Sequence, residues 1–391
     1  MRQVAGLIST YSSDEFGICS ALYELGGMVV MHDASGCNST YTTHDEPRWY
    51  DMDSMIYISA ISEMEAIMGD DEKLIHDIIE TAKEMKPKFI AIVGAPIPYM
   101  IGTDLKAIAS IVEEGLKIPS FGFEANGMNG YLTGMSMAFE ALVDRFCVRD
   151  IRRKNEKKVN IIGATPLDFS LNGSIDSIKE WIKKIGLEPG ACFAMRGSLH
   201  DLEMAGDASV NLVISYGGYE AAKKMKELFD IPYVTGVPIG SVFSKVLEEK
   251  IKDAIKTGED QITSQLQIKD AQVKQKYAKK KIVVIGESIY ATSLATAIEQ
   301  EYGMVARVLC PLETTNTLLR KDDIQTIEED DLIVELRKED IDAVIADPLY
   351  QPIIPDGVKF YPLGHIAFSG RIYENEIPNL IGQKLVKQQE D

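Results

Sequence analysis

Three segments of the chain share one pattern of apolar and polar positions. In each, a short apolar run leads into a glycine-containing loop, and apolar residues spaced three or four apart follow. The segments are 88–115, 159–186 and 281–303. Strands that alternate with amphipathic helices are typical of parallel sheets covered by helices. The pattern predicts an α/β protein of three Rossmann-like domains, each with its own parallel sheet.

Two charged stretches separate these segments. Residues 149–158 read RDIRRKNEKK, which predicts a loop between the first two units. Residues 262–281 are polar, free of glycine and rich in lysine, which predicts a solvent-exposed linker helix. We therefore expect an N-terminal domain at 1–150 and a middle domain at 151–262. The linker helix and a C-terminal domain would make up 263–391.

Composition narrows the classes of function. The chain has 391 residues and a formal net charge of −19, which argues against a nucleic-acid-binding or anionic-membrane surface. No apolar run approaches the roughly 18 residues that a membrane-spanning helix needs. Five cysteines, odd in number and irregular in spacing, favour a reducing cytoplasm over a disulfide framework. These are Cys19, Cys37, Cys147, Cys192 and Cys310.

The segment richest in reactive side chains is 28–49, which reads MVVMHDASGCNSTYTTHDEPRW. An apolar run typical of a buried strand ends in His32 and Asp33, and Gly36 precedes Cys37. Ligands of open α/β sheets sit beyond the carboxyl ends of strands, and glycine lets a backbone approach them closely. We interpret this loop as the working site, with His32, His44 and Asp45 as acid–base candidates. Alternatively, Cys37 is an inert buried cysteine and HDEPRW is a loop locked by salt bridges.

Several motifs, in order, resemble the nitrogenase component 1 family, which includes nitrogenase molybdenum-iron subunits, cofactor scaffolds and tetrapyrrole reductases. His32 followed by Gly36 and Cys37 is similar to the family's His-Gly-Pro-x-Gly-Cys loop. Segments 59–74, 101–105 and 211–240 are similar to later family motifs. Asp33 and Ala34 replace Gly-Pro, so the resemblance indicates a divergent branch rather than a true nitrogenase subunit.

The resemblance implies an iron–sulfur cluster. In the family, a cysteine of this loop ligates a cluster at a subunit interface, and we expect the same of Cys37, with a 4Fe-4S cluster shared between subunits. Cys19 is a candidate second ligand, although its position on an inward helix face fits a core residue equally well. The family's third cysteine is Ala95 here. Two chains would then combine Cys19 and Cys37 from each, or Asp33 would supply an oxygen ligand.

The resemblance also bears on the active-site cofactor, which the family holds with a middle-domain cysteine and a late histidine. Ser215 stands at the cysteine position, and His365 is the histidine near the end of the chain. We therefore expect that the iron–molybdenum cofactor is not held in the usual way and that an organic substrate takes its place. His365 also fits a core or loop residue. Glu63 belongs to a segment that the family places beside the cavity, but an acid also suits a helix start.

These considerations give three sets of candidate residues. The catalytic candidates are His32, His44, Asp45 and Glu63. The cofactor-binding candidates are Gly36, Asp33, Ser215 and His365, and the metal-binding candidates are Cys37 and Cys19.

The sequence lacks the motifs of a nucleotide site. It contains no Walker motif and no G-x-G-x-x-G, so we expect this chain to bind no nucleotide and to receive electrons from a partner. By resemblance, that partner is an ATP-hydrolysing iron-protein reductase, and the chain forms a homodimer, or a heterodimer or tetramer with a paralogous subunit. The expected function is a nitrogenase-like reductase that relays low-potential electrons through an interface cluster to an unknown substrate. The alternative is a cofactor-assembly scaffold or a binding protein of the same fold without redox catalysis.

Overall fold

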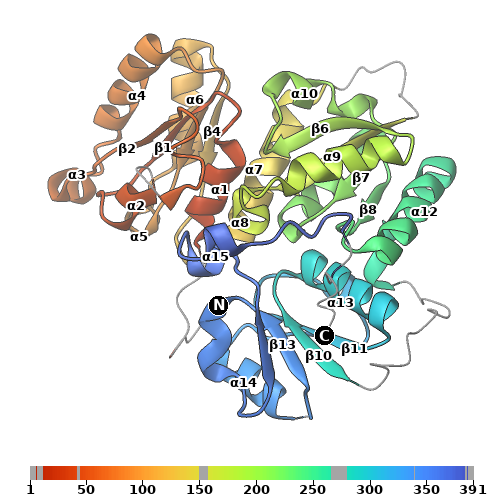
Figure 1. Ribbon diagram of the computed structural model, residues 1–391. Helices are drawn as coiled ribbons and strands as arrows, with labels where there is room; N and C mark the ends of the chain where they lie inside the picture. Colours follow the sequence, from red (N-terminus) through yellow and green to blue (C-terminus); the bar gives the residue numbers. More distant parts are fainter. Residues whose placement is uncertain are drawn as a thin grey trace.

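Three separate parallel sheets organise the chain, as Figure 1 shows for the computed structural model. The structure describes Gly6 and residues 12–41, 45–148, 157–265, 280–338, 340–383 and 385, without the side chain of Cys37. The first sheet has the order β2-β1-β3-β4, and every pairing in it is parallel. Its strands are β1 (Met28–Met31), β2 (Met55–Ile58), β3 (Ile90–Val93) and β4 (Ser120–Phe123).

The middle and third sheets repeat this arrangement with five strands each. The middle sheet has the order β6-β5-β7-β8-β9, with β5 (Lys158–Ala164), β6 (Glu188–Ala194), β7 (Val210–Val213), β8 (Tyr233–Thr235) and β9 (Gln261–Ile262). The third has the order β12-β11-β10-β13-β14, with β10 (Lys281–Ile285), β11 (Val305–Cys310), β12 (Ile324–Gln325), β13 (Ala343–Ala346) and β14 (Lys359–Pro362). The α/β class and the three parallel sheets are therefore confirmed.

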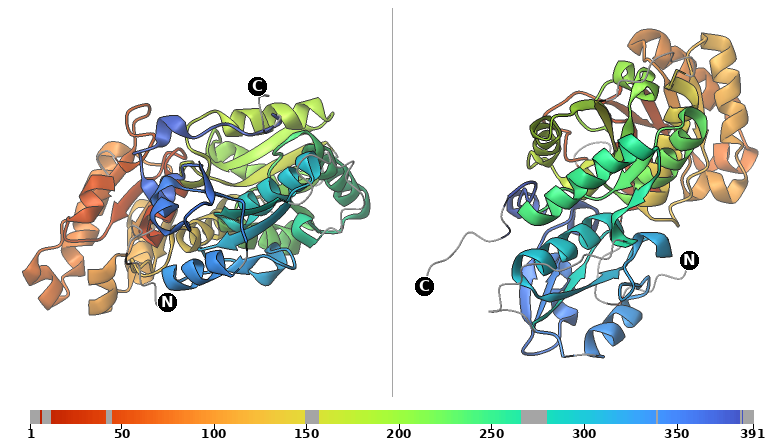
Figure 2. Two further views of the ribbon diagram at one scale, coloured as in Figure 1. Left: turned by 60° about the horizontal axis from the view of Figure 1, so that its bottom comes forward. Right: turned by 90° about the vertical axis from the view of Figure 1, so that its right-hand side faces the viewer.

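Helices flank the three sheets, as the two further views in Figure 2 show. Those of the first sheet are α1 (Asp14–Leu22), α2 (Cys37–Thr40), α3 (Glu63–Met68), α4 (Asp71–Met85), α5 (Pro96–Ile101), α6 (Leu105–Leu116) and α7 (Tyr131–Phe146). The middle sheet has α8 (Pro166–Phe169), α9 (Ser174–Lys184), α10 (Leu199–Glu203), α11 (Tyr219–Phe229) and α12 (Ser241–Thr257). The rest are α13 (Ser288–Tyr302), α14 (Glu329–Arg337) and α15 (Ile366–Ser369).

The predicted domain boundaries remain predictions. Residues 149–156 and most of the predicted linker helix, 266–279, lie outside the described residues. After β14 the chain returns to the middle sheet, where Ile381 forms an antiparallel bridge with Ile239 and the Gly382 N–H donates to the Pro238 carbonyl. The last segment therefore joins the third unit to the middle one, a contact that the sequence pattern did not indicate.

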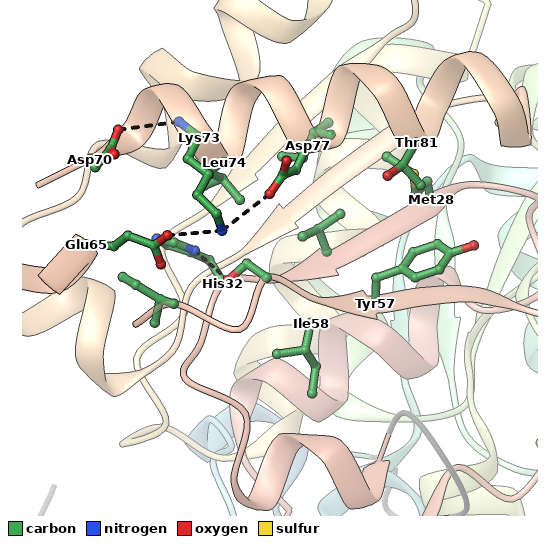
Figure 3. A pocket seen from close by; sticks show the side chains of 14 residues that line it. Met28, His32, Tyr57, Ile58, Glu65, Asp70, Lys73, Leu74, Asp77 and Thr81 are labelled. Carbon is green, nitrogen blue, oxygen red and sulfur yellow. Dashed lines mark hydrogen bonds and ion pairs between the residues drawn. The ribbon is translucent and has the colours of Figure 1, made fainter. Parts of the chain in front are cut away.

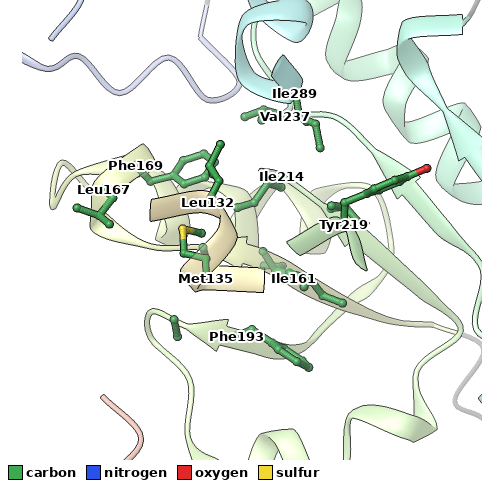
Figure 4. Packing of buried hydrophobic residues seen from close by; sticks show 14 of the residues in the cluster. Leu132, Met135, Ile161, Leu167, Phe169, Phe193, Ile214, Tyr219, Val237 and Ile289 are labelled. Carbon is green, nitrogen blue, oxygen red and sulfur yellow. The ribbon is translucent and has the colours of Figure 1, made fainter. Parts of the chain in front are cut away.

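Alternating side chains divide the first sheet between two apolar layers. Val29 and Met31 face the large core, whereas Met28 and Val30 face a smaller cluster under α4 and α6. The large core continues into the middle unit, where Leu132 and Met135 of α7 lie near Phe169 (Figure 4). Helix α7 thus connects the first unit to the middle one.

Two glycines let α1 and α7 approach at backbone distance. A Cβ at Gly134 would lie 1.9 Å from the Asp14 carbonyl oxygen, and one at Gly17 would lie 2.0 Å from that of Tyr131. Because contacts that short are impossible, both positions require glycine. This close crossing holds Tyr131, the first residue of α7, at the junction of the three units.

Candidate functional site

The loop after β1 is tied to the end of β2 through one serine. The Oγ of Ser59 lies 2.8 Å from Nδ1 of His32 and accepts a hydrogen bond from the Asp33 N–H at 3.2 Å. Asp33 in turn accepts from the side-chain amide of Asn38 at 2.8 Å. Gly36 has a φ of 98°, a conformation that disfavours other residues. His32, Asp33 and Gly36 are thus held at the carboxyl edge of the sheet, where Cys37 begins α2.

The second half of this loop is built around a buried arginine. The Nε of Arg48 donates to Glu46 at 2.6 Å, and its other nitrogens donate to Glu24 at 3.1 Å and to the Ser20 carbonyl at 2.8 Å. Tyr41 donates to the same Glu46 at 2.8 Å. These contacts favour the salt-bridge-locked interpretation for Glu46 and Arg48. Asp45 is exposed, and His44 lies outside the described residues.

Cys19 lies in the core, on the inner face of α1, with 0% of its surface exposed. Burial raises the pKa of its thiol, and the nearby carboxylates Glu15 and Glu46 raise it further. Metal ligation needs the thiolate, so this environment favours the core interpretation of Cys19.

The described residues do not assemble a metal site within one chain. They contain no group of three His, Cys, Asp or Glu side chains placed to hold a metal ion. Ala95, at the family's third cysteine position, is the N-cap of α5. Cys37 and Asp33 therefore remain the candidate cluster ligands, and the described residues around them do not complete a site within one chain.

Glu63 is exposed in the first turn of α3. Ser62 caps this helix, accepting from the Glu65 N–H while the Glu65 carboxylate accepts from the Ser62 N–H. This capping arrangement favours the interpretation that Glu63 and Glu65 are acidic residues that stabilise the start of a helix. The apolar side chains of α3 are exposed to solvent: Met64 is 65% exposed and Met68 is 72% exposed.

A cavity of about 160 Å³ opens beside His32, between α4 and the strands β1 and β2 (Figure 3). His32 is 4% exposed, and burial lowers the pKa of its imidazole. Across the cavity, the Lys73 ammonium lies 3.1 Å from Glu65 and 3.4 Å from Asp77. Burial thus disfavours the charged form of this imidazole, which lies at the end of a cavity lined by both apolar and charged side chains.

A second polar cluster lies where the three units meet, and its centre is Asp168 at the end of α8. The hydroxyl of Tyr131 donates to Oδ1 of Asp168, and the hydroxyl of Ser215 donates to Oδ2 at 2.6 Å. His365 places Nε2 at 3.3 Å from Oδ1. Two of the four predicted cofactor-binding residues, Ser215 and His365, are thus brought to one carboxylate. We call Tyr131, Asp168, Ser215 and His365 the junction cluster.

Tyr131 and Ser215 of the junction cluster are buried, and His365 is partly exposed. Burial, with Asp168 nearby, raises the pKa of Tyr131. Asp347 fixes the His365 backbone, because its Oδ2 accepts from the His365 N–H at 2.7 Å. Nδ1 of His365 is buried and finds no hydrogen-bond partner in the described part of the chain. One imidazole nitrogen of His365 therefore contacts Asp168, and the other has no hydrogen-bond partner among the described residues.

A buried glutamate lies next to the junction cluster. Glu287 caps α13 by accepting from the Ile289 and Tyr290 N–H groups, and it also accepts from the Tyr216 N–H at 3.0 Å. Burial, and then the charge of Asp168, raises the pKa of Glu287 to about 7. It therefore joins the third unit to the middle one and exchanges its proton near neutral pH.

Comparison with known proteins establishes the family. The family model described as nitrogenase component 1 type oxidoreductase matches residues 21–347, which is most of the chain. The chain therefore belongs to this family.

Individual relatives share only part of their length with the chain. The cofactor biosynthesis protein NifE of Sinorhizobium fredii is 26% identical over 52% of this chain and 41% of its own length. NifE of Clostridium pasteurianum is 29% identical over 44% of this chain and 38% of its own. The chain thus spans less than half the length of these curated relatives. A light-independent protochlorophyllide reductase polypeptide of Crocosphaera subtropica is 23% identical over 83% of this chain and 72% of its own.

The fold is found in solved structures as well. A structure of nitrogenase Cp1 at pH 6.5 aligns with a TM-score of 0.67, covering 93% of this chain and 87% of that one at 16% identity. At that identity the likeness supports the fold. None of the described helices is both long and apolar enough to cross a membrane.

Sequence reasoning missed three residues of the junction. Tyr131, Asp168 and Glu287 were not candidates, although Asp168 and Glu287 follow the apolar runs that open the second and third repeated segments. Their position beyond the carboxyl ends of strands β5 and β10 was the available signal. Nothing in the sequence showed that these two strand ends face each other.

Proposed function

We propose that the chain is a subunit of a nitrogenase-like oxidoreductase that reduces an organic substrate at the junction cluster. The observation that carries this proposal is the shared Asp168 carboxylate, which gathers Tyr131, Ser215 and His365. By family resemblance, Ser215 stands at the position of the cysteine that holds the active-site cofactor, and His365 is the histidine near the end of the chain. Here a serine hydrogen-bonded to a carboxylate replaces a thiolate, which disfavours a metal cofactor held at this point.

The residues of the junction cluster can supply protons. A reduction that adds electrons to an organic molecule also consumes protons, and positioned acid groups accelerate such transfers. Tyr131 and His365 each carry a transferable proton next to Asp168, which orients both side chains. Glu287, with its pKa near 7, can replace a proton drawn from the cluster.

Electrons would arrive through an interface iron–sulfur cluster that Cys37 helps to hold. A bound cluster supplies single-electron transfer at low potential. The burial of Cys19 supports one cysteine ligand from this chain, so a second subunit, identical or paralogous, must provide the others. The reductant would be an ATP-hydrolysing iron protein, and the complex would work in the cytoplasm.

An exposed apolar surface on two neighbouring helices supports the proposal that this chain binds a partner protein. Helices α3 and α5 lie in contact, and each exposes large apolar side chains. We call this surface the α3/α5 patch; it consists of Met64, Ile67, Met68, Tyr99, Met100 and Ile101. Contiguous exposed apolar surface of this kind marks sites of protein association.

Anaerobic purification of the full chain tests the proposal. Iron and sulfide should be present in the wild type and in Cys192→Ala, which removes a buried cysteine of β6 as a control. Cys37→Ala should lose the iron and shift the complex towards monomer, because a cluster shared between chains couples metal binding to assembly. Wild-type protein without iron, or Cys37→Ala protein that keeps all of it, would contradict the electron relay.

A second candidate is a cofactor-assembly scaffold. The buried Cys19 and the alanine at position 95 favour it, because they leave this chain with few ligands for a permanent cluster. Both NifE relatives are cofactor biosynthesis proteins. Asp168→Asn distinguishes the two functions. A reductase should lose turnover while keeping its iron, whereas a scaffold should keep its ability to receive and release a cofactor.

A further inference from the structure

The cavity beside His32 exists because an edge strand is left partly uncovered. Strand β2 lies at the edge of the first sheet, and α4 packs over its neighbours, with Leu74 and Ile78 buried against Met28 and Val30. Tyr57 of β2 is only partly buried. Strand β1 and helix α4 therefore supply an apolar floor of Met28, Val30, Leu74 and Ile78, and residues 57–59 at β2 line the cavity as well (Figure 3).

One end of this cavity is polar, because the imidazole of His32 lies there. Nδ1 of His32 is bonded to Ser59, while no described residue forms a hydrogen bond with Nε2. Figure 3 shows the imidazole at the end of the cavity, next to Glu65 and Lys73. Nε2 is therefore available to a hydrogen-bonding group of a ligand in the cavity.

Charges around the cavity are already paired with one another. The Lys73 ammonium bridges Glu65 and Asp77, and the Asp70 carboxylate accepts from the Lys73 N–H at the start of α4. An anion would find no free cation among the described residues that line the cavity, and a cation would have to displace Lys73 from two carboxylates. Either charge would also lose its hydration on an apolar floor. The site therefore suits an uncharged ligand.

Volume and hydrogen bonding define the ligand further. The cavity of about 160 Å³ is close to the roughly 150 Å³ that accommodates a benzene ring. A hydroxyl group can both donate and accept, so it can bond His32 in either tautomer. We propose that this cavity binds a small neutral molecule with one ring and one hydroxyl group, the chemical class of phenol. The site is separate from the junction cluster, so it does not depend on the reductase proposal.

Binding can be measured on the full-length protein with methyl-labelled methionine. The Met28 methyl signal, assigned by its loss in Met28→Leu, should shift and saturate with phenol, while Met225 in the middle unit should not. Phenol should bind about fivefold more tightly than benzene, as one net hydrogen bond allows. Benzoate and benzylamine should bind more weakly than either.

Variants separate the hydrogen bond from the apolar contact. His32→Leu should remove the preference for phenol over benzene, whereas His76→Leu, on the exposed side of α4, should keep it. Ile78→Phe, which fills the cavity from α4, should weaken both ligands at least about tenfold. Charged probes that bind as tightly as phenol, or an Ile78→Phe protein that binds like the wild type, would overturn the proposal. So would an unshifted Met28 signal.

Discussion

The imidazole Nε2 of His365 lies 3.3 Å from the carboxylate Oδ1 of Asp168, although one residue follows the last strand of the third sheet and the other follows the first strand of the middle sheet. This contact and the hydrogen bonds from the Ser215 and Tyr131 hydroxyl groups to the same carboxylate join the three units at their junction. The junction cluster is therefore both a candidate site and a structural connection.

Replacing Asp168 by asparagine should destabilise the protein. Both carboxylate oxygens accept hydroxyl hydrogen bonds, and an amide has only one accepting oxygen, so one hydroxyl would lose its partner. We expect a loss of about 1–3 kcal/mol in the free energy of unfolding, measured with urea. Asp176→Asn, on the exposed first turn of α9, should change it by less than about 0.5 kcal/mol. Equal losses in the two variants would show that the hydrogen bonds to Asp168 contribute no more to the free energy of unfolding than an exposed carboxylate does.

Replacing Arg48 by methionine should be more damaging than removing a surface arginine. The change leaves the buried carboxylates of Glu46 and Glu24 without their cation, and unpaired buried charges cost about 3–5 kcal/mol. Arg145→Met is the matched control, because its ion pair with Glu113 is exposed and contributes about 1 kcal/mol or less. Urea unfolding of both variants compares the two losses. A mild effect of Arg48→Met would show that the loop is not held by this arginine.

Two glycine-to-alanine changes in helices should have opposite signs. At Gly134 the new methyl would meet the Asp14 carbonyl oxygen at 1.9 Å and force α1 from α7, so we expect a loss of at least about 2 kcal/mol. At Gly115 in α6 the nearest atom is the Ile79 Cδ1 at 3.5 Å, so alanine should stabilise by about 0.5–1 kcal/mol through helix propensity. Melting temperatures report both changes. Similar shifts in the two variants would contradict the close crossing of α1 and α7.

The stability of the protein should fall as pH rises through neutrality. Burial raises the pKa of Glu15 to about 7, and its Oε2 is buried without a partner in the described residues. A folded-state pKa above the unfolded value means that the native state holds the proton more tightly. The contribution of Glu15 is therefore complete below pH 4.5 and is lost as pH rises through about 7.

Glu15→Gln removes this titration. The variant should lose less stability than the wild type between pH 5 and pH 8, by up to about 3 kcal/mol in the free energy of unfolding. Urea unfolding at several pH values measures the slope. Glu114→Gln, on the exposed face of α6, should follow the wild-type curve. A Glu15→Gln slope that equals the wild-type slope would show that Glu15 is already ionised in the native state.

Local patterns were sufficient to predict the three sheets. Each apolar run becomes a parallel strand, as β3, β5 and β10 show, because burial on both faces of a parallel strand requires a continuous apolar stretch. Ordered motifs likewise indicated the family, which the family model confirms over residues 21–347. Both signals lie within short stretches of chain, where neighbouring residues decide the conformation.

Long-range packing settled what the local patterns left open. Cys19 and Arg48 have the same neighbours in the sequence whether they face a ligand or the core, and only the approach of α1 to the loop after β1 buries them. Asp168 gathers Tyr131, Ser215 and His365 because α7, β7 and α15 converge, and each of those contacts joins residues far apart in the chain. Such contacts depend on how separate sheets pack together, which no spacing within the sequence records.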